Sequence, residues 1–295
     1  VSPGSAGSEG TSYYAAPHYI TSDLHSLFLK QTSYAEFDFR SDEYTEARLF
    51  EASMDWEVVY GQSPLELIER FTEYAGRMPA PPAWTQAGAI VALARPLDES
   101  LALVESMIDA GVEISGVWNQ TWSGINVTFI GEQVLWNWVL DEDEHPGWHD
   151  WVADLAAHDI RTLCYANSMF LDLSDRETEP RRHLFREGED AGYFVKNEEG
   201  ETLKLPVTAF DVALLDFTNE DARTWMKSVI VDEMVEHAGC SGWMVDFAEA
   251  LPFEAELHDG TPASEYHNRY PVEWMKLNRE AIEEAGLLGD ILTFN

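Results

Sequence analysis

From residue 87 onward, short apolar runs alternate with longer segments of helical periodicity, and this alternation constrains the fold more than any other feature. The apolar runs show little polar alternation, which is typical of parallel strands covered on both faces. Strands that alternate with helices pair in parallel through right-handed crossovers. The expected strands are 87–93, 114–118, 161–167, 214–216, 243–246 and 289–295, and the expected helices are 98–110, 145–158, 219–238 and 271–285. The predicted fold class is therefore α/β.

Six parallel strands are too few to close an eight-stranded barrel, and no helix follows the last of them. The fold is then either an open sheet or part of a barrel. We favour a (β/α)8 TIM barrel that is incomplete in this chain, because the sequence stops within a strand and is expected to be truncated at its C-terminal end.

The first 75 residues have a different pattern. Residues 1–12 are rich in Gly, Ser and Pro and are expected to form a flexible lead-in. Short strands at roughly ten-residue spacing then favour an antiparallel sandwich or its remnant. These strands are expected at 26–29, 35–39, 47–50 and 56–60. A helix is expected over 64–75, with Ser63 as its N-cap and Gly76 as its stop.

Three prolines, Pro79, Pro81 and Pro82, follow this helix and predict a stiff connector. They mark the domain boundary. Residues 1–75 are expected to be the sandwich or its remnant with a linking helix, and residues 76–295 the first part of the barrel.

The chain carries 54 acidic and 18 basic residues, for a formal charge of −36, and the acids are spread along its whole length. Repulsion among so many carboxylates opposes folding in dilute salt and is tolerated where concentrated salt shortens the screening length. We therefore predict a halophilic source and a high-salt, cytoplasmic location. Nucleic acid is excluded as an expected partner, because counterion release needs a basic face. Without an apolar stretch of membrane length, no membrane partner is expected, while a homo-oligomer is left open.

Cys164 and Cys240 lie in apolar stretches and are expected to be buried and reduced. The chain lacks a C-x-x-C pair, so no structural zinc site is expected. In so acidic a chain, acid clusters arise by chance, and the acidic run 141–144 is interpreted as a solvated loop. Neither a metal nor a cofactor is expected.

The run GWMVDFAEALP at 242–252 ends an apolar strand in two acids, Asp246 and Glu249. In a barrel the C-terminal strand ends carry the chemistry, so Asp246 is a candidate catalyst. It could instead cap the next helix or pair with an arginine. Retaining glycoside cleavage needs two carboxylates about 5–5.5 Å apart. Glu249 could be the second carboxylate or a residue that only hydrogen-bonds the turn.

Tryptophans and amides alternate in two neighbouring segments, WNQTWSG at 118–124 and WNW at 136–138. Indole faces can stack on sugar rings while Asn and Gln hydrogen-bond the hydroxyls. The same indoles could equally be core packing. Both interpretations stay open on the residues alone.

These segments, together with LDFTN at 215–219 and HNRYP at 267–271, resemble glycoside hydrolase family 31, with most similarity to its sulfoquinovosidase branch. The resemblance implies a retaining α-glycosidase on a (β/α)8 barrel, preceded by a β-sandwich that ends within residues 1–60. It makes Asp246 the nucleophile and places the acid/base aspartate after Asn295. The expected substrate is a small carbohydrate, an α-glucoside or a sulfoquinovoside. This chain alone is expected to be inactive.

The resemblance also implies substrate-binding residues. Gln120 and Trp136 match positions that contact the sugar and its sulfonate, and Glu249 matches a supporting glutamate. The further expected substrate-binding residues are Trp122, Asp216 and His267. Gln133 stands where the branch has a sulfonate-binding arginine, and an amide cannot supply that cationic fork. Thr121 replaces an acid, and Ala248 a glycine. A neutral α-glucoside or another modified sugar is thus as well supported as sulfoquinovose.

A second hypothesis comes from a different functional class. The chain could be a carbohydrate-binding or degenerate barrel fragment that stacks a sugar on Trp118, Trp122 and Trp136 without turning it over.

The acidic composition predicts that salt stabilises the fold. Moving the purified protein from salt-free buffer to molar KCl should raise its unfolding midpoint by about 5 °C or more, since 1 kcal/mol shifts the midpoint of a chain of this size by roughly 2–4 °C. Thermal unfolding followed by circular dichroism measures this. Sucrose at matched osmolarity is the control for solute exclusion. A midpoint that does not respond to KCl would contradict the halophilic interpretation.

Overall fold

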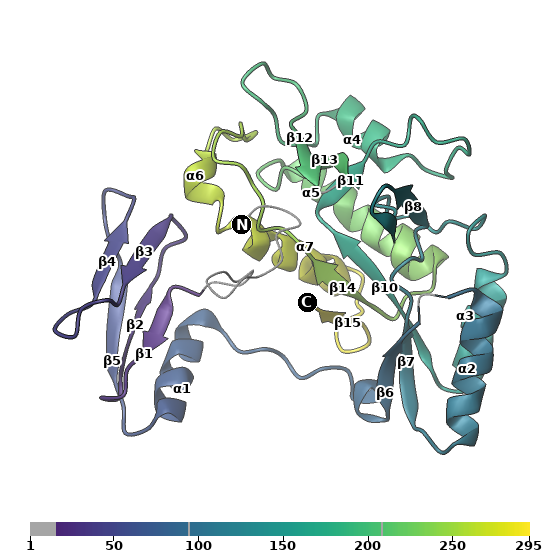
Figure 1. The fold of residues 1–295 in the computed structure, drawn as a ribbon, viewed down its shortest axis with the longest axis horizontal. Helices are drawn as coiled ribbons and strands as arrows, with labels where there is room; N and C mark the ends of the chain where they lie inside the picture. Colours follow the sequence, from purple (N-terminus) through teal and green to yellow (C-terminus); the bar gives the residue numbers. More distant parts are fainter. Residues whose placement is uncertain (1–15, 94, 208) are drawn as a thin grey trace.

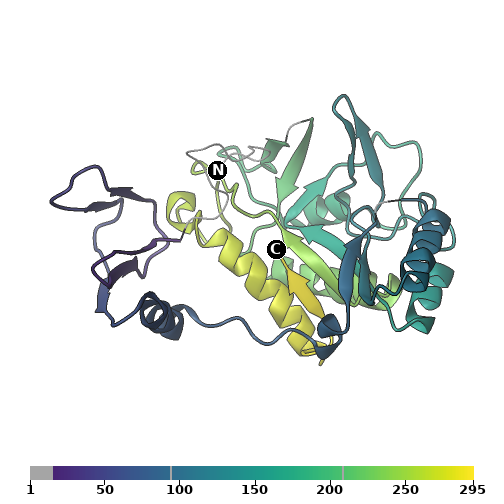
Figure 2. The same cartoon turned by 60° about the horizontal axis from the view of Figure 1, so that its bottom comes forward.

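The computed structural model describes residues 16–93, 95–207 and 209–295, and Figure 1 shows two units joined by an extended connector. The expected lead-in 1–12 lies outside the described residues. The smaller unit, up to α1 (Pro64–Ala75), stands to one side of the larger α/β unit in both Figure 1 and Figure 2.

The smaller unit is an antiparallel β-structure covered by one helix. Its sheet has the order β1-β2-β5, and a separate hairpin pairs β3 with β4. The strands are β1 (His18–Ile20), β2 (His25–Leu29), β3 (Ala35–Asp38), β4 (Glu46–Leu49) and β5 (Trp56–Tyr60). Phe28, Val59 and Leu67 form a small core of their own, with Phe71 packed against it. The four strands predicted in this region are confirmed.

Helix α1 begins and ends as its sequence predicts. The Ser63 hydroxyl accepts a hydrogen bond from the Glu66 backbone N–H at 3.3 Å, and Pro64 occupies the first turn. Gly76 has φ 89° and its N–H closes the last turn on the Thr72 carbonyl. Because a side chain at this φ would be strained, glycine is the residue that ends the helix here.

The larger unit is built on a five-stranded, curled, parallel sheet. Its order follows the sequence, β6-β7-β10-β14-β15, with every neighbour parallel. The strands are β6 (Ala89–Ala92), β7 (Ile114–Trp118), β10 (Arg161–Asn167), β14 (Gly242–Asp246) and β15 (Leu292–Phe294). This confirms an incomplete (β/α)8 barrel after sandwich-like strands. The sequence predicted six parallel strands, one too many, because β13 (Phe210–Leu214), which precedes Asp216, belongs to another sheet.

Helices connect these strands on the outside of the sheet. They are α2 (Leu97–Asp109), α3 (Trp148–Ala157), α5 (Glu220–Ser228) continued by the π-helix η2 (Val229–His237), and α7 (Tyr270–Glu284). Figure 2 shows α7 running alongside the C-terminal strands. Two short helices, η1 (Ala83–Gln86) and α6 (Ala263–Tyr266), lie in the connections.

Two insertions leave the carboxyl end of the sheet. The hairpin of β8 (Ile125–Thr128) and β9 (Gly131–Val134) lies within the tryptophan-rich loop. The second insertion holds α4 (Leu184–Ala191) and an antiparallel sheet of order β11-β13-β12. Its strands are β11 (Met169–Leu171), β12 (Lys204–Val207) and β13 (Phe210–Leu214). These strands were not among those expected from the sequence, since short strands within long loops leave little periodic signal.

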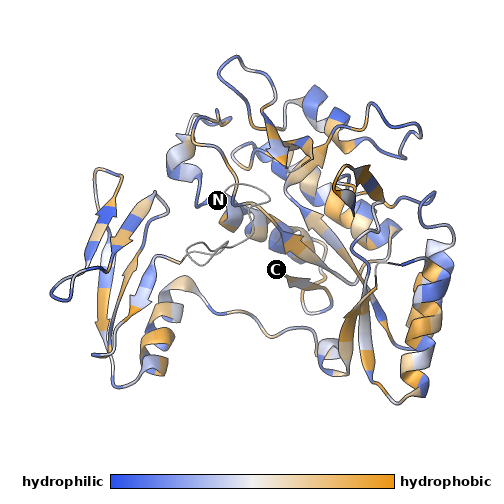
Figure 3. Ribbon diagram, viewed as in Figure 1, coloured by the Kyte–Doolittle hydropathy of each residue, from blue (hydrophilic) through white to orange (hydrophobic). Residues whose placement is uncertain are grey.

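The core of the larger unit lies between the sheet and its helices, and Figure 3 shows the central parallel strands as mostly hydrophobic. Trp243 of β14 is fully buried, and its indole N–H donates to the Asn278 side-chain oxygen on α7 at 2.8 Å. None of the helices in the described ranges is both long and apolar enough to cross a membrane.

Two expectations from the sequence are corrected here. Cys164 and Cys240 are buried as expected, but they form a disulfide with Cα atoms 5.9 Å apart and are not reduced. The bridge joins β10 to the turn before β14. Asp141 is also not solvated, since its carboxylate is only 8% exposed and pairs with the Arg176 guanidinium at 2.5 Å.

Gly242 allows β14 and β15 to approach. A Cβ at this position would lie 2.5 Å from the Leu292 carbonyl oxygen, which belongs to backbone and cannot rotate away. Gly242→Ala should therefore destabilise the protein by about 1–3 kcal/mol through overpacking. Urea unfolding in high salt measures the loss, with the neighbouring Ser241→Ala as a control that adds no atom. Equal stability of the two variants would show that the β14–β15 pairing can open at no cost.

Candidate active site

Asp246 lies at the carboxyl end of β14, in the rim where parallel barrel strands present their functional groups. It is half-buried, and its Cα pairs with that of Asn167 at the end of β10. Its Oδ2 accepts a hydrogen bond from the Tyr165 hydroxyl at 2.8 Å, and its carbonyl accepts one from the Trp274 indole at 3.2 Å. Among the described residues it neither caps a helix nor pairs with an arginine. The rim therefore holds this carboxylate in a fixed position.

Tyr165 and Asn167 were not among the residues predicted for the site. Both lie on β10 two positions apart, so their side chains share the face that carries Asp246. The Asn167 amide nitrogen donates to the Tyr165 oxygen at 3.3 Å. The same strand-end reasoning that selected Asp246 could have found them, applied to the strand 161–167.

Tyr165 remains a neutral donor. Burial raises its pKa well above the ordinary value, and the negative charge of Asp246 raises that pKa further. Its phenol therefore keeps its proton and can hydrogen-bond the carboxylate across the working pH range.

The chain turns sharply after Asp246. Phe247 has φ 43°, a left-handed conformation that is uncommon for a non-glycine residue. Its ring packs on Trp136 with centroids 5.6 Å apart, and Trp136 also contacts the edge of Phe210 at 5.3 Å. Phe247 thus links Trp136 to the end of β14. Backbone strain of the kind shown by Phe247 is common at functional sites.

Glu249 stays within this turn. It is half-buried, and its Oε2 accepts a hydrogen bond from the Ala248 backbone N–H at 3.0 Å. This contact stabilises the backbone directly after the strand end.

The tryptophans of the loop mainly support β10. The Trp118 indole donates to the Cys164 carbonyl, and the Trp122 indole to the Tyr165 carbonyl, both at 2.8 Å. Trp122 is fully buried and leaves no face for a sugar, so the expectation that it stacks on substrate is wrong in this structure. Trp138 is fully buried as well and packs on Tyr165. Their contribution is to packing around the Tyr165 strand.

The two predicted glutamines lie on the loops above the sheet. Gln120 is half-buried and follows Asn119, whose side-chain oxygen accepts from the Thr121 N–H at 3.0 Å. Gln133 is on β9, where its Oε1 accepts from the Thr128 hydroxyl at 3.3 Å. The hairpin therefore engages one end of the Gln133 amide.

Asp216 is almost fully buried, and three donors use its carboxylate. Oδ1 accepts from the N–H and hydroxyl of Thr218 at 2.9 and 2.7 Å, and Oδ2 accepts from the His258 N–H at 2.7 Å. These bonds pin the loop after β14 to the end of β13. Its observed role is structural.

His267 is half-buried beside the same loop. Its Nδ1 lies 2.5 Å from the Leu251 carbonyl oxygen, and Phe253 packs edge-on against the ring. Burial lowers the pKa of His267, so the ring is neutral near pH 7 and Nδ1 carries the proton that it donates.

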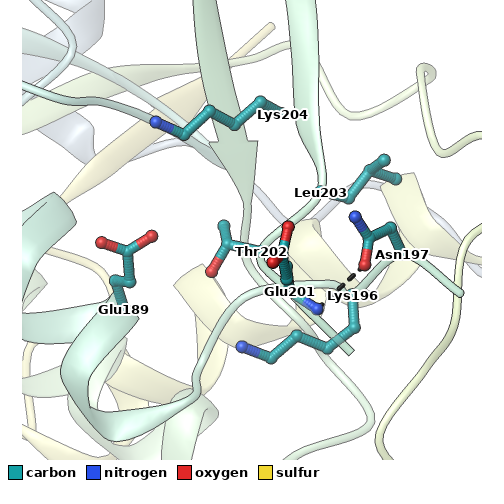
Figure 4. Close-up of a pocket in the computed structure, with 7 residues that line it drawn as sticks. All are labelled: Glu189, Lys196, Asn197, Glu201, Thr202, Leu203 and Lys204. Atoms are coloured by element: carbon teal, nitrogen blue, oxygen red, sulfur yellow. Dashed lines mark hydrogen bonds between the residues drawn. The ribbon is translucent and has the colours of Figure 1, made fainter. Parts of the chain in front are cut away.

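A cavity of about 640 Å³ lies on the second insertion, away from these residues. Figure 4 shows the side chains of Lys196 and Lys204 extending toward the side on which Glu189 lies. None of the residues predicted for the site lines it.

Comparisons with known proteins agree with this architecture. A family described as the glycosyl hydrolases family 31 TIM-barrel domain matches residues 78–287. The sulfoquinovosidase of Escherichia coli K12 is 31% identical over 282 residues, which are 96% of this chain and 40% of that protein. The sulfoquinovosidase of Agrobacterium fabrum is 31% identical over 294 residues, 100% of this chain and 43% of that protein. The chain therefore spans about two fifths of the length of these relatives.

Solved structures show the same likeness. A family 31 sulfoquinovosidase from E. rectale, in complex with the aza-sugar inhibitor IFGSQ, superposes with a TM-score of 0.86 at 31% identity, over 95% of this chain and 41% of that one. A Flavobacterium johnsoniae dextranase complexed with glucose superposes at 0.81 with 17% identity, over 99% of this chain and 36% of that one, and shares the fold. Since the family match covers more than half of the residues, this chain belongs to glycoside hydrolase family 31.

Proposed function

We propose that this chain provides the nucleophile of a retaining α-glycosidase, and that Asp246 is that nucleophile. The observation that carries the proposal is the hydrogen bond from Tyr165 to Asp246 Oδ2 at the rim of a family 31 barrel. None of the side-chain hydrogen bonds between described residues ends on Oδ1 of Asp246. That oxygen is the one available to attack a sugar.

In the proposed reaction, Asp246 Oδ1 forms a bond to the anomeric carbon as the glycosidic C–O bond breaks. An aspartate beyond Asn295 protonates the leaving oxygen, and water later releases the sugar with that aspartate acting as base. The Tyr165 hydroxyl stabilises negative charge on Asp246 before attack and again when the carboxylate departs. Charge-assisted hydrogen bonds of this kind are roughly twice as strong as neutral ones.

The proposed glycone is an α-glucoside or a sulfoquinovoside. Two similar relatives are named sulfoquinovosidases, and both cover nearly the whole chain. Gln133 supports the neutral sugar, because its amide carries no positive charge for a sulfonate and one end already bonds Thr128. Gln120, Trp136, Glu249 and His267 remain proposed contacts or supports of the substrate. The buried Asp216 instead holds the backbone at His258, and the buried Trp122 holds β10 at Tyr165.

The composition supports a high-salt cytoplasm as the place of action. The Cys164–Cys240 bridge instead supports an oxidising compartment, since disulfides are rare in reducing ones. We give the charge more weight, because it involves acidic residues along the whole chain, whereas the disulfide is a single buried bridge.

A mechanism-based α-glycoside inactivator tests the nucleophile. In the full-length protein the label should be found on Asp246, and Asp246→Asn should abolish both labelling and turnover of an aryl α-glucoside, a loss of about 10⁴-fold or more. Peptide mass spectrometry locates the label. Absence of any label would favour the carbohydrate-binding alternative. Hydrolysis by residues 1–295 alone, lost in Asp246→Asn, would contradict an acid beyond Asn295.

Tyr165→Phe tests the hydrogen bond to the nucleophile. Removing a donor to a charged group should lower kcat/KM about 10- to 100-fold, corresponding to about 1.5–3 kcal/mol. Steady-state kinetics measure the change, and circular dichroism checks the fold. Tyr193→Phe is the matched control, since Tyr193 packs on Trp225 away from the rim. Equal activity of the two variants would remove Tyr165 from the mechanism.

A further inference from the structure

Three potential metal ligands from separate segments meet on the helical side of the barrel. Glu142 lies in the loop before α3, His149 in the first turn of α3, and His237 at the last position of η2. We propose that these three side chains bind a divalent transition-metal ion of the zinc class. No metal was expected from the sequence. His149 and His237 lie 88 positions apart along the chain, so only the fold brings them together and no sequence motif marks the site.

The distances between the ligand atoms are close to those that a metal needs. Glu142 Oε1 lies 3.3 Å from His149 Nε2 and 3.6 Å from His237 Nε2, and all three ligand atoms lie within 4.8 Å of one another. Tetrahedral zinc with bonds of about 2.0–2.1 Å separates its ligand atoms by about 3.3 Å. The ligand atoms would therefore have to shift by at most about 1.5 Å relative to one another to bind such an ion.

His237 supplies an independent reason to expect a ligand. Its Nε2 is buried and has no hydrogen-bond partner among the described residues, although the atom points toward Glu142. A buried polar atom without a partner destabilises the folded state, and a ligand would remove that cost. Burial lowers the pKa of His237, and the positive charge of Arg181 lowers it further, so the ring is neutral near pH 7. A neutral imidazole nitrogen is the form that binds metal.

The surrounding charges are mixed. Arg181 opposes a cation, but it forms an ion pair with the buried Glu233 that offsets part of its charge. The acidic loop adds Asp143 and Glu144, and the carbonyl end of η2 favours positive charge at His237. The charges around Glu142, His149 and His237 therefore allow a divalent cation to bind there.

The ligand set selects the metal. Two imidazoles and one carboxylate suit zinc, cobalt, nickel or copper, whereas magnesium and calcium prefer oxygen ligands. Glu142 and His149 are each 56% exposed, so an ion can enter from solvent and keep water in its remaining positions. A bound ion would tie the loop before α3 and its first turn to the end of η2, and would stabilise the fold without taking part in the chemistry at Asp246.

The test uses the purified, chelator-treated protein in molar KCl, where general charge screening is already saturated. Zn²⁺ should raise the unfolding midpoint, and Co²⁺ should give visible d–d absorption typical of tetrahedral coordination. Mg²⁺ at the same concentration should do neither. Competition with a chromophoric chelator gives the affinity for Zn²⁺.

Variants then assign the site. His149→Ala and His237→Ala should each weaken Zn²⁺ binding by at least about 10- to 100-fold, because even outer partners of metal ligands contribute that much. His158→Ala, an exposed histidine at the other end of α3, is the matched control and should bind as the parent does. His149→Ala alters an exposed side chain, so it decides the matter even if His237→Ala does not fold.

Unchanged binding in His149→Ala, an equal response to Mg²⁺, or no binding of Zn²⁺ at all would each overturn the proposal. Because the readouts are affinity, absorption and stability, they do not depend on whether Asp246 catalyses hydrolysis.

Discussion

The parallel pairing of β10 with β14 is the constraint on which the candidate site depends. Its register sets Asn167 beside Asp246 and leaves Tyr165 one pleat below, within hydrogen-bond distance of the carboxylate. A slip of one residue would turn Tyr165 to the opposite face of the sheet and break this contact. The disulfide of Cys164 with Cys240 and the indoles of the tryptophan-rich loop both act on β10 near this pairing. The loop thus contributes indirectly to the position of Asp246.

Asp246 is held from the helical side as well. Trp274 on α7 donates to its carbonyl, and Asn278, one turn later on the same helix, accepts from the buried Trp243 in β14. Two indole hydrogen bonds therefore fix the strand against α7, while Tyr165 fixes the carboxylate on the inner face. The proposed role of Asp246 as nucleophile requires this double restraint, because an error of about 1 Å in the position of a reacting group can cost 10²-fold in rate.

Local patterns predicted the elements, but not the contacts between them. The strands 114–118 and 161–167 and the helix 64–75 were predicted with their observed bounds, since apolar runs, a serine cap and a terminal glycine are local signals. The sequence alone could not show whether Trp122 packs in the core or stacks on a sugar, because its burial depends on β10, 43 residues away. Asp216 resembled a rim acid, yet its donors come partly from His258. The Cys164–Cys240 bridge likewise depends on tertiary structure.

The acidic surface and the interior use charge differently. Several arginines form ion pairs with partly buried acids, namely Arg223 with Glu273, Arg182 with Glu233 and Arg176 with Asp141. Buried pairs are screened little by salt, because water and ions do not reach them. With only 18 basic residues in the chain, each cation used inside leaves more surface carboxylates without a partner. Salt therefore acts on the surface repulsion, whereas the geometry around Asp246, which depends on buried hydrogen bonds, should be the same in dilute and concentrated salt for as long as the chain is folded.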